Sequence, residues 1–303
     1  MRDGVLFASS RDRVGFELGI GAGLGRGNDW TASGGSLRHG SAAAGKRTEL
    51  RARWHHYSLL GYEVPVSRLT KILPEWLSLV KEERQGEEVG WVWVQSFRDE
   101  GGWGLADRSE GFEQTTYSVS VESTQGMGQY LLGHAIGSLS AVGARNLWAQ
   151  PWHLSAIELQ VAWQSSGGGC REYRLHSQSQ WDNSRWELAP VGTAATGWEQ
   201  ESGAPVPFPT ESNYLFSRGG AGLGERRIRL EGVRLEPVRV VQAKSEFLER
   251  SGLVRGGELL RPAVAGVQQV VRAVVDLVDG EIGSSVPAKG EPSRQSPVLF
   301  QAA

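Results

Sequence analysis

The sequence is poor in cysteine, in net charge and in long apolar runs, and each absence narrows the class of protein. Cys170 is the only cysteine among 303 residues, so the chain forms neither an intrachain disulfide nor a cysteine-based metal cluster. A reducing cytoplasm is therefore the compartment we expect. No run of 18 apolar residues and no apolar stretch of signal-peptide length is present, so we expect a soluble protein without a membrane partner. The formal net charge of -2 does not indicate the basic surface that binds a nucleic acid.

Lysine is also scarce and unevenly placed. The lysines are Lys46, Lys71, Lys81, Lys244 and Lys289. The long central part of the chain between Lys81 and Lys244 therefore has no lysine amine, and Schiff-base chemistry requires one as its nucleophile.

Motifs for a cofactor, a metal or a catalytic serine are missing as well. The glycine-rich stretch 19–27 does not meet the G-x-G-x-x-G spacing, and no helical pattern follows it. The histidines show no H-E-x-x-H motif and no close zinc spacing. The run GSLSA around Ser138 is not a G-x-S-x-G elbow. We therefore expect no cofactor and no metal.

Two regions of different composition divide the chain. Residues 1–53 are rich in glycine and cannot bury enough apolar surface to offset their ordering entropy. We expect them to be a disordered N-terminal tail. Periodic apolar patterns begin near Trp54, so we expect a single folded domain over residues 54–303.

Alternation of apolar and polar residues predicts that this domain is mostly β. The expected strands are 57–64, 90–97, 112–122, 157–163, 170–180, 226–235 and 237–243, with 297–301 as a closing strand. Helical spacing predicts short helices at 67–73, 138–149 and 244–252, and an amphipathic helix at 263–278. The proline-containing region 182–213 is expected to be a long polar insertion.

The strand at 112–122 indicates how the core is built. Tyr117, Val119 and Val121 share one face with Glu113, and serine, threonine and glutamine occupy the other face. We expect the apolar face to point inward, so the Glu113 carboxylate needs a solvated rim or a partner. The same alternation in the other strands predicts a buried core of Tyr117, Val119, Val121, Ile157, Leu159, Val161, Tyr173 and Leu175.

The stretch from Ser138 to Trp163 carries the most specific signal. Acetoacetate decarboxylases have a segment A-x-x-x-GRE-x-WGFPKK-x-A-x-I-x-L, and the positions that match it in order are Ala141, Arg145, Trp148, Pro151, Ala156, Ile157 and Leu159. Phe112, Glu113 and Tyr117 add an F-E-x-x-x-Y strand. Over residues 56–254 the chain thus resembles the YqjF-like family, bacterial proteins of unknown function with an acetoacetate-decarboxylase-like fold. The resemblance implies an antiparallel β-cone or barrel with short helices packed outside it.

The resemblance fails at the residues that carry the decarboxylase chemistry. In those enzymes one of two adjacent lysines forms a Schiff base with the ketone, and the two lysines fall here on Trp152 and His153. The acidic residue that follows the arginine is Asn146. Because neither Trp152 nor His153 replaces a lysine nucleophile, the resemblance does not imply decarboxylase activity.

Two functional hypotheses stay open. In the first, the barrel binds a small molecule, or acts on a small carbonyl compound by acid–base chemistry with His153 and Glu113 as candidate catalytic residues. Its ligand-binding residues would be Glu113, Tyr117, Arg145, Trp148, Trp152 and His153. In the second, side chains fill the barrel, which serves as a non-catalytic structural or interaction module. A cavity beside Trp152 would distinguish the two, whereas the ligand and the oligomeric state are left open.

Overall fold

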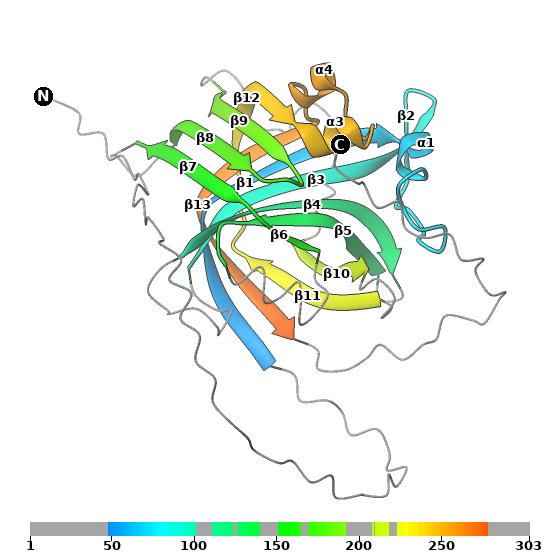
Figure 1. Cartoon of the computed structure of the whole chain (residues 1–303), viewed down its shortest axis with the longest axis horizontal. Helices are drawn as coiled ribbons and strands as arrows, with labels where there is room; N and C mark the ends of the chain where they lie inside the picture. Colours follow the sequence, from blue (N-terminus) through cyan, green and yellow to red (C-terminus); the bar gives the residue numbers. More distant parts are fainter. Residues whose placement is uncertain are drawn as a thin grey trace, which may run out of the picture.

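The structure is a computed structural model, and it describes residues 48–100, 111–123, 126–139, 151–164, 169–191, 208, 210–217 and 223–277. Strands make up most of this part of the chain (Figure 1). In chain order the elements are β1 (Thr48–Pro65), α1 (Val66–Leu69), β2 (Glu82–Arg84), β3 (Glu87–Glu100), β4 (Phe112–Ser123), β5 (Gly126–Ile136), β6 (Trp152–Leu154), β7 (Ala156–Trp163), β8 (Cys170–Gln178), β9 (Asn183–Pro190), β10 (Glu211–Ser217), β11 (Leu223–Glu231), β12 (Glu236–Ser245), α3 (Glu246–Arg250), α4 (Gly256–Leu259) and β13 (Val264–Leu277).

The described strands form a closed barrel with a second sheet against it (Figure 1). The barrel order is β1-β3-β4-β5-β10-β11-β13, and antiparallel pairing of β13 with β1 closes it, from Thr48 opposite Leu277 to Gly61 opposite Val264. Strand β12 pairs with β13 through its first residues and with β9 through the rest, so it leads into the second sheet, β12-β9-β8-β7. The expected mostly β barrel with short helices outside it is confirmed.

Two cores hold these layers together. The inner core fills the barrel, and its large members include Trp54, Tyr57, Trp93, Phe216 and Val271. The outer core lies between the barrel wall and the second sheet, and it includes Val94, Tyr117, Leu175, Trp186 and Leu248. Where the second sheet covers it, the barrel wall is therefore buried on both of its faces.

Strand β4 shows which side chains of the barrel wall point inward and which point outward. Its apolar face does not point in the expected direction. Tyr117, Val119 and Val121 are buried, but they belong to the outer core. The polar face is the one inside the barrel, where the Trp93 indole and the Gln129 amide both donate hydrogen bonds to Ser120 Oγ. Serine and glutamine side chains are tolerated there because they satisfy one another.

Most of the expected strands are confirmed, as is the predicted core. β1, β3, β4, β7, β8, β11 and β12 contain or closely match the predicted segments. The eight predicted core residues are buried, except that Ile157 is half-buried against the outer core. The helix expected at 244–252 is present as α3, with Ser245 as its N-cap.

The amphipathic helix expected at 263–278 is wrong, because these residues form β13. Val267, Val271, Val274 and Val275 are buried, and they lie in the strand that closes the barrel. Valine loses side-chain freedom in a helix and packs well on a pleated sheet. The helix-like spacing arose because both faces of a buried barrel strand carry valine.

The polar insertion expected at 182–213 is also wrong in part, because it contains β9 and the start of β10. In β9 the buried residues Ser184, Trp186 and Leu188 alternate with exposed or half-buried ones. Two of these intervening residues, Arg185 and Glu187, form an ion pair at 2.6 Å.

Three smaller differences concern element ends. β1 begins at Thr48, so six residues assigned to the tail are paired in the barrel. Helix α1 spans Val66–Leu69 with Pro65 at its N-cap, whereas the expected helix ran over 67–73. Residues 126–136, expected to lead into a helix, form β5. The expected elements at 138–149 and 297–301, apart from residues 138 and 139, lie outside the described residues, as do residues 1–47 of the tail.

Candidate functional site

Among the described residues, aromatic side chains pack together at one end of the barrel interior, and a small cavity lies toward the other end. At the first end Trp91 and Trp93 stack with 5.0 Å between ring centroids, and Phe208 packs edge-on against Trp93. At the other end a cavity of about 30 Å³ remains. Its lining residues are Trp54, Gln95, Phe97, Gln114, Thr116, Leu131, His134, Tyr214, Phe216, Arg226 and Ile228. This volume is enough for a few non-hydrogen atoms, because one water needs about 10–15 Å³ of such space.

A hydrogen-bond chain fixes one wall of the cavity. The Tyr57 hydroxyl donates to Gln95 Oε1 at 3.1 Å, and Gln95 Nε2 donates to the Tyr214 hydroxyl oxygen at 2.9 Å. Since the Tyr214 oxygen accepts in this arrangement, its own hydrogen can be donated to a further acceptor in the cavity. Burial raises the pKa of Tyr214 to about 12, which keeps the phenol protonated at neutral pH.

Two other polar atoms of the lining residues are buried without a hydrogen-bond partner in the described part of the chain. These are Trp54 Nε1 and His134 Nε2, in residues that are only 4% and 8% exposed. Burial, followed by the nearby charges of Arg226 and His153, lowers the pKa of His134 to about 3. His134 is therefore neutral at pH 7. A buried polar atom without a partner costs about 1–3 kcal/mol, and a ligand or a water in the cavity would remove that cost.

Arg226 brings a positive charge to the same cavity. It lies on β11 opposite Tyr214 of β10, and its guanidinium carbon is 5.8 Å from the ring centroid of Trp152. Trp152 also meets the His134 ring edge-on, with centroids 5.6 Å apart. The cavity thus combines a cation, a neutral imidazole and hydroxyl and amide groups with aromatic walls.

The structure separates the residues that the sequence placed in one pocket. Trp152 faces the barrel interior beside His134 and Arg226. His153 faces the other way and stacks flat on Trp181, with centroids 4.4 Å apart and 1° between the ring planes. None of the described candidates is among the residues that line the cavity.

Glu113 and Tyr117 also lie on the outer side of the wall. Glu113 accepts a hydrogen bond from Arg98 Nη1 at 2.8 Å. Tyr117 meets Trp181 edge-on at 5.3 Å, so it shares an aromatic cluster with His153. Its hydroxyl donates to Asp182 Oδ2 at 2.5 Å, and burial, followed by the Asp182 charge, raises its pKa well above the usual value. The remaining two candidates, Arg145 and Trp148, lie outside the described residues.

Sequence reasoning missed the residues that do line the cavity. Gln114 and Thr116 lie on the face of β4 that was expected to point away from the core, and His134 lies on a strand that was not expected. Arg226 stands near the start of a predicted strand, but its position alone gives no signal. The one usable clue was the row of uncharged polar side chains from Gln114 to Ser120 along β4, which is unusual for a solvent-facing strand.

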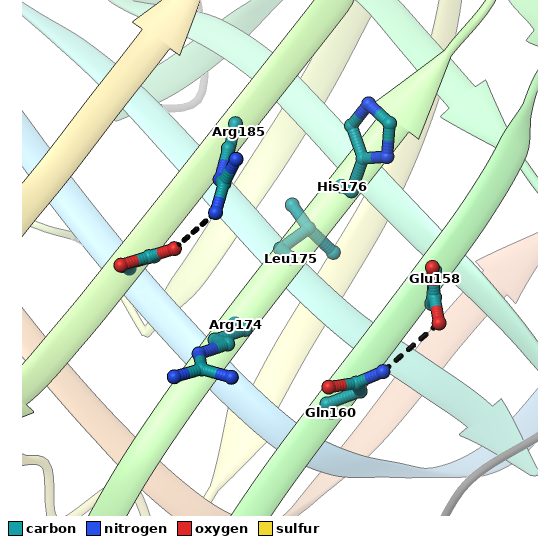
Figure 2. A pocket seen from close by; sticks show the side chains of 7 residues that line it. Glu158, Gln160, Arg174, Leu175, His176 and Arg185 are labelled. Atoms are coloured by element: carbon teal, nitrogen blue, oxygen red, sulfur yellow. Dashed lines mark hydrogen bonds and ion pairs between the residues drawn. The ribbon is translucent and has the colours of Figure 1, made fainter.

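A larger hollow lies elsewhere, on the outer face of the second sheet (Figure 2). It measures about 290 Å³ and lies over β7, β8 and β9. Its side chains already bind neighbours on their own strands: Gln160 donates to Glu158, and Arg185 donates to Glu187. Figure 2 shows these pairs lying along the strands rather than converging on one point. We therefore regard this hollow as a solvated surface and the barrel cavity as the candidate site.

Other site types have no support in the described part of the chain. No group of three His, Cys, Asp or Glu side chains there is arranged to hold a metal ion. No described helix is long and apolar enough to cross a membrane. Lys244, a candidate for a displaced nucleophile, is exposed on β12 and pairs with Glu246 at 3.0 Å.

Comparison with known proteins adds a likeness of fold. No protein-family model matches the chain, and no curated protein matches it either. An acetoacetate decarboxylase from Legionella pneumophila has 11% identity and a TM-score of 0.43, with 75% of this chain and 84% of that chain covered.

Two further solved structures give similar values. An acetoacetate decarboxylase-like enzyme from Sphingomonas wittichii RW1 has 12% identity and a TM-score of 0.46, over 75% and 89% of the two chains. The enduracididine biosynthesis enzyme MppR complexed with pyruvate has 11% identity and a TM-score of 0.45, over 80% and 92%. At these values the likeness carries no argument about ligand or activity.

Proposed function

We propose that the barrel binds a small carboxylate in its interior cavity. The observation that carries this proposal is a cavity that combines the Arg226 guanidinium with two buried polar atoms, Trp54 Nε1 and His134 Nε2, which have no hydrogen-bond partner among the described residues. An arginine is suited to carboxylates because its planar donors match the two oxygens. The small volume favours a ligand of a few non-hydrogen atoms.

The charge balance of the cavity supports an anion over a neutral ligand. Of the described residues that line the cavity, Arg226 is the one that carries a formal charge at pH 7, because His134 is neutral there. Trp54 Nε1 donates only, and the Tyr214 hydroxyl has a hydrogen available. These groups favour acceptor atoms, which a carboxylate supplies and an ammonium does not.

Acid–base catalysis by His153 and Glu113 is less well supported than binding. The two residues lie outside the cavity, and each contacts a different neighbour, Trp181 and Arg98 respectively. If the cavity has chemistry of its own, His134 is the nearest imidazole, but a pKa of about 3 makes it a weak base at neutral pH.

The test is calorimetric titration of the protein with formate, acetate and acetamide. We expect acetate to bind and acetamide, which has the same shape without the charge, to bind at least about tenfold more weakly. Arg226→Gln should abolish acetate binding. Arg229→Gln is the matched control, because Arg229 lies on the same strand, is exposed and pairs with Glu231.

The aromatic packing at one end of the barrel favours a second candidate, a non-catalytic structural or interaction module. Trp91, Trp93 and Phe208 pack against one another there, in line with a side-chain-filled barrel. Equal and negligible binding of all three compounds by the wild type and by Arg226→Gln would support this candidate and contradict the first.

A further inference from the structure

We infer that Trp152 sets the size of the ligand that the barrel accepts and holds Arg226 in place to receive it. This inference rests on the proposed function, since it concerns the same cavity. It differs from the sequence-based view of Trp152 as a ligand-contacting residue, because the indole stands behind the lining residues and acts through them.

The position of Trp152 follows from how β5 shares one of its edges. One edge of β5 pairs with β4 along its length. The other edge pairs with β10 over residues 128–130 and with β6 over residues 134–136. The short strand β6 therefore pairs with the part of β5 that β10 does not reach. In this pairing Trp152 lies opposite His134.

The Trp152 side chain fills the space behind the cavity on this side. It is 5% exposed, and it packs with Ile136 and Phe112. Its ring meets the edge of His134 and faces the guanidinium of Arg226. A cation over an indole face is attracted by the ring quadrupole, so the indole restrains the group that we expect to bind the carboxylate. Both lining residues are thus prevented from moving away from the cavity.

The Trp152 side chain then limits the volume of the cavity. Protein interiors are close-packed, so an indole behind two lining side chains leaves them one arrangement. Replacing it with a small side chain opens a space next to the cavity, and such spaces collapse only in part. A longer carboxylate could place its chain there. Trp152 accordingly excludes ligands with more than a few carbon atoms.

The experiment compares straight-chain carboxylates from acetate to hexanoate on the wild type, Trp152→Ala and Trp152→Phe. For the wild type we expect affinity to fall at least about tenfold by butyrate, the lower end of what one misfitting methylene costs. For Trp152→Ala we expect the order to reverse, with affinity rising up to about fourfold per added methylene. Trp152→Phe keeps an aromatic ring and should give an intermediate preference.

Two further measurements distinguish a specific effect of Trp152 on the cavity from a general loss of packing. Indole added to Trp152→Ala should refill the space and return the preference to acetate, as apolar cavities bind matching apolar molecules. Trp186→Ala is the control for a buried tryptophan lost elsewhere, because Trp186 belongs to the outer core; it should keep the wild-type order. If Trp152→Ala destabilises the fold too far, Trp152→Phe and Trp152→Leu provide the same comparison.

The possible failures are distinguishable. If the wild type binds acetate and the Trp152 variants keep its chain-length order, Trp152 has only a packing role and this inference is wrong. If the wild type and Arg226→Gln bind no carboxylate of any length, the proposed function is wrong and this inference falls with it. A reversed order that indole does not restore would contradict the placement of the new space at the indole position.

Discussion

Asp182 offers the sharpest test of how the second layer is attached to the barrel. This carboxylate is 1% exposed and lies in the turn between β8 and β9. It accepts hydrogen bonds from the Tyr117 hydroxyl at 2.5 Å, the Phe247 backbone N–H at 2.8 Å and the Ser245 hydroxyl at 3.3 Å. The three donors come from β4, from α3 and from the N-cap of α3. A single side chain therefore joins the barrel wall, the second sheet and the helix.

The expected cost of removing Asp182 can be worked from these bonds. A hydrogen bond to a charged group contributes about 1.5–3 kcal/mol, and a buried donor left without a partner costs about 1–3 kcal/mol. Since the bonds share one carboxylate and the Ser245 bond is long, the contributions do not simply add. We expect Asp182→Ala to lower the free energy of unfolding by about 3–5 kcal/mol, the range for breaking a buried charged network. Tyr117→Phe, which removes one donor, should cost about 1.5–3 kcal/mol.

Urea unfolding followed by circular dichroism measures both values. The control is Glu172→Ala, because Glu172 forms an exposed ion pair with Arg174 and such pairs contribute about 0–1 kcal/mol. The double variant should cost less than the sum of the two single ones, since Tyr117 and Asp182 interact directly. If Asp182→Ala costs less than about 1 kcal/mol, or if the two variants are additive, the network does not attach the layers as we argue.

Three further predictions test other parts of the structure. Incubation with acetoacetate and borohydride should give no adduct by intact mass, because no lysine is among the described residues that line the cavity; an adduct at Lys244 would contradict this and restore the decarboxylase mechanism. His134, whose pKa burial lowers to about 3, contributes stability that is present above about pH 6.5 and is lost as the pH falls toward 3. Between pH 7 and about 4.5 the wild type should lose about 2–3 kcal/mol more than His134→Gln in urea unfolding, and parallel losses would show that His134 is not buried in the neutral form. Leu159→Ala should cost about 2–5 kcal/mol, since Leu159 belongs to the outer core, and a loss below about 0.5 kcal/mol would place it at the surface.

The sequence predicted the barrel better than it predicted the barrel's interior. Strands with one exposed face, such as β8, alternate clearly, and Tyr173 and Leu175 were assigned correctly. Where the second sheet covers it, the barrel wall is buried on both faces, so the wall strands there do not show that contrast. In β13 the valines on both faces imitated a helix, and in β4 the polar face was taken for the solvent side. Both errors have one cause: a strand between two cores has no solvent-facing side to mark its register.

The grouping of adjacent candidate residues shows the same limit of sequence reasoning. Trp152 and His153 were grouped because they follow Pro151 and occupy the places of two family lysines. In a strand, however, successive side chains point to opposite faces, and β6 is a strand. One residue therefore reaches the cavity side, beside His134 and Arg226, while the next stacks on Trp181 in the outer layer. Because the two residues are adjacent on one strand, their side chains lie on opposite faces of the sheet. At most one of them can therefore contact a ligand inside the barrel. By our inference that residue is Trp152, whose indole contacts His134 and Arg226.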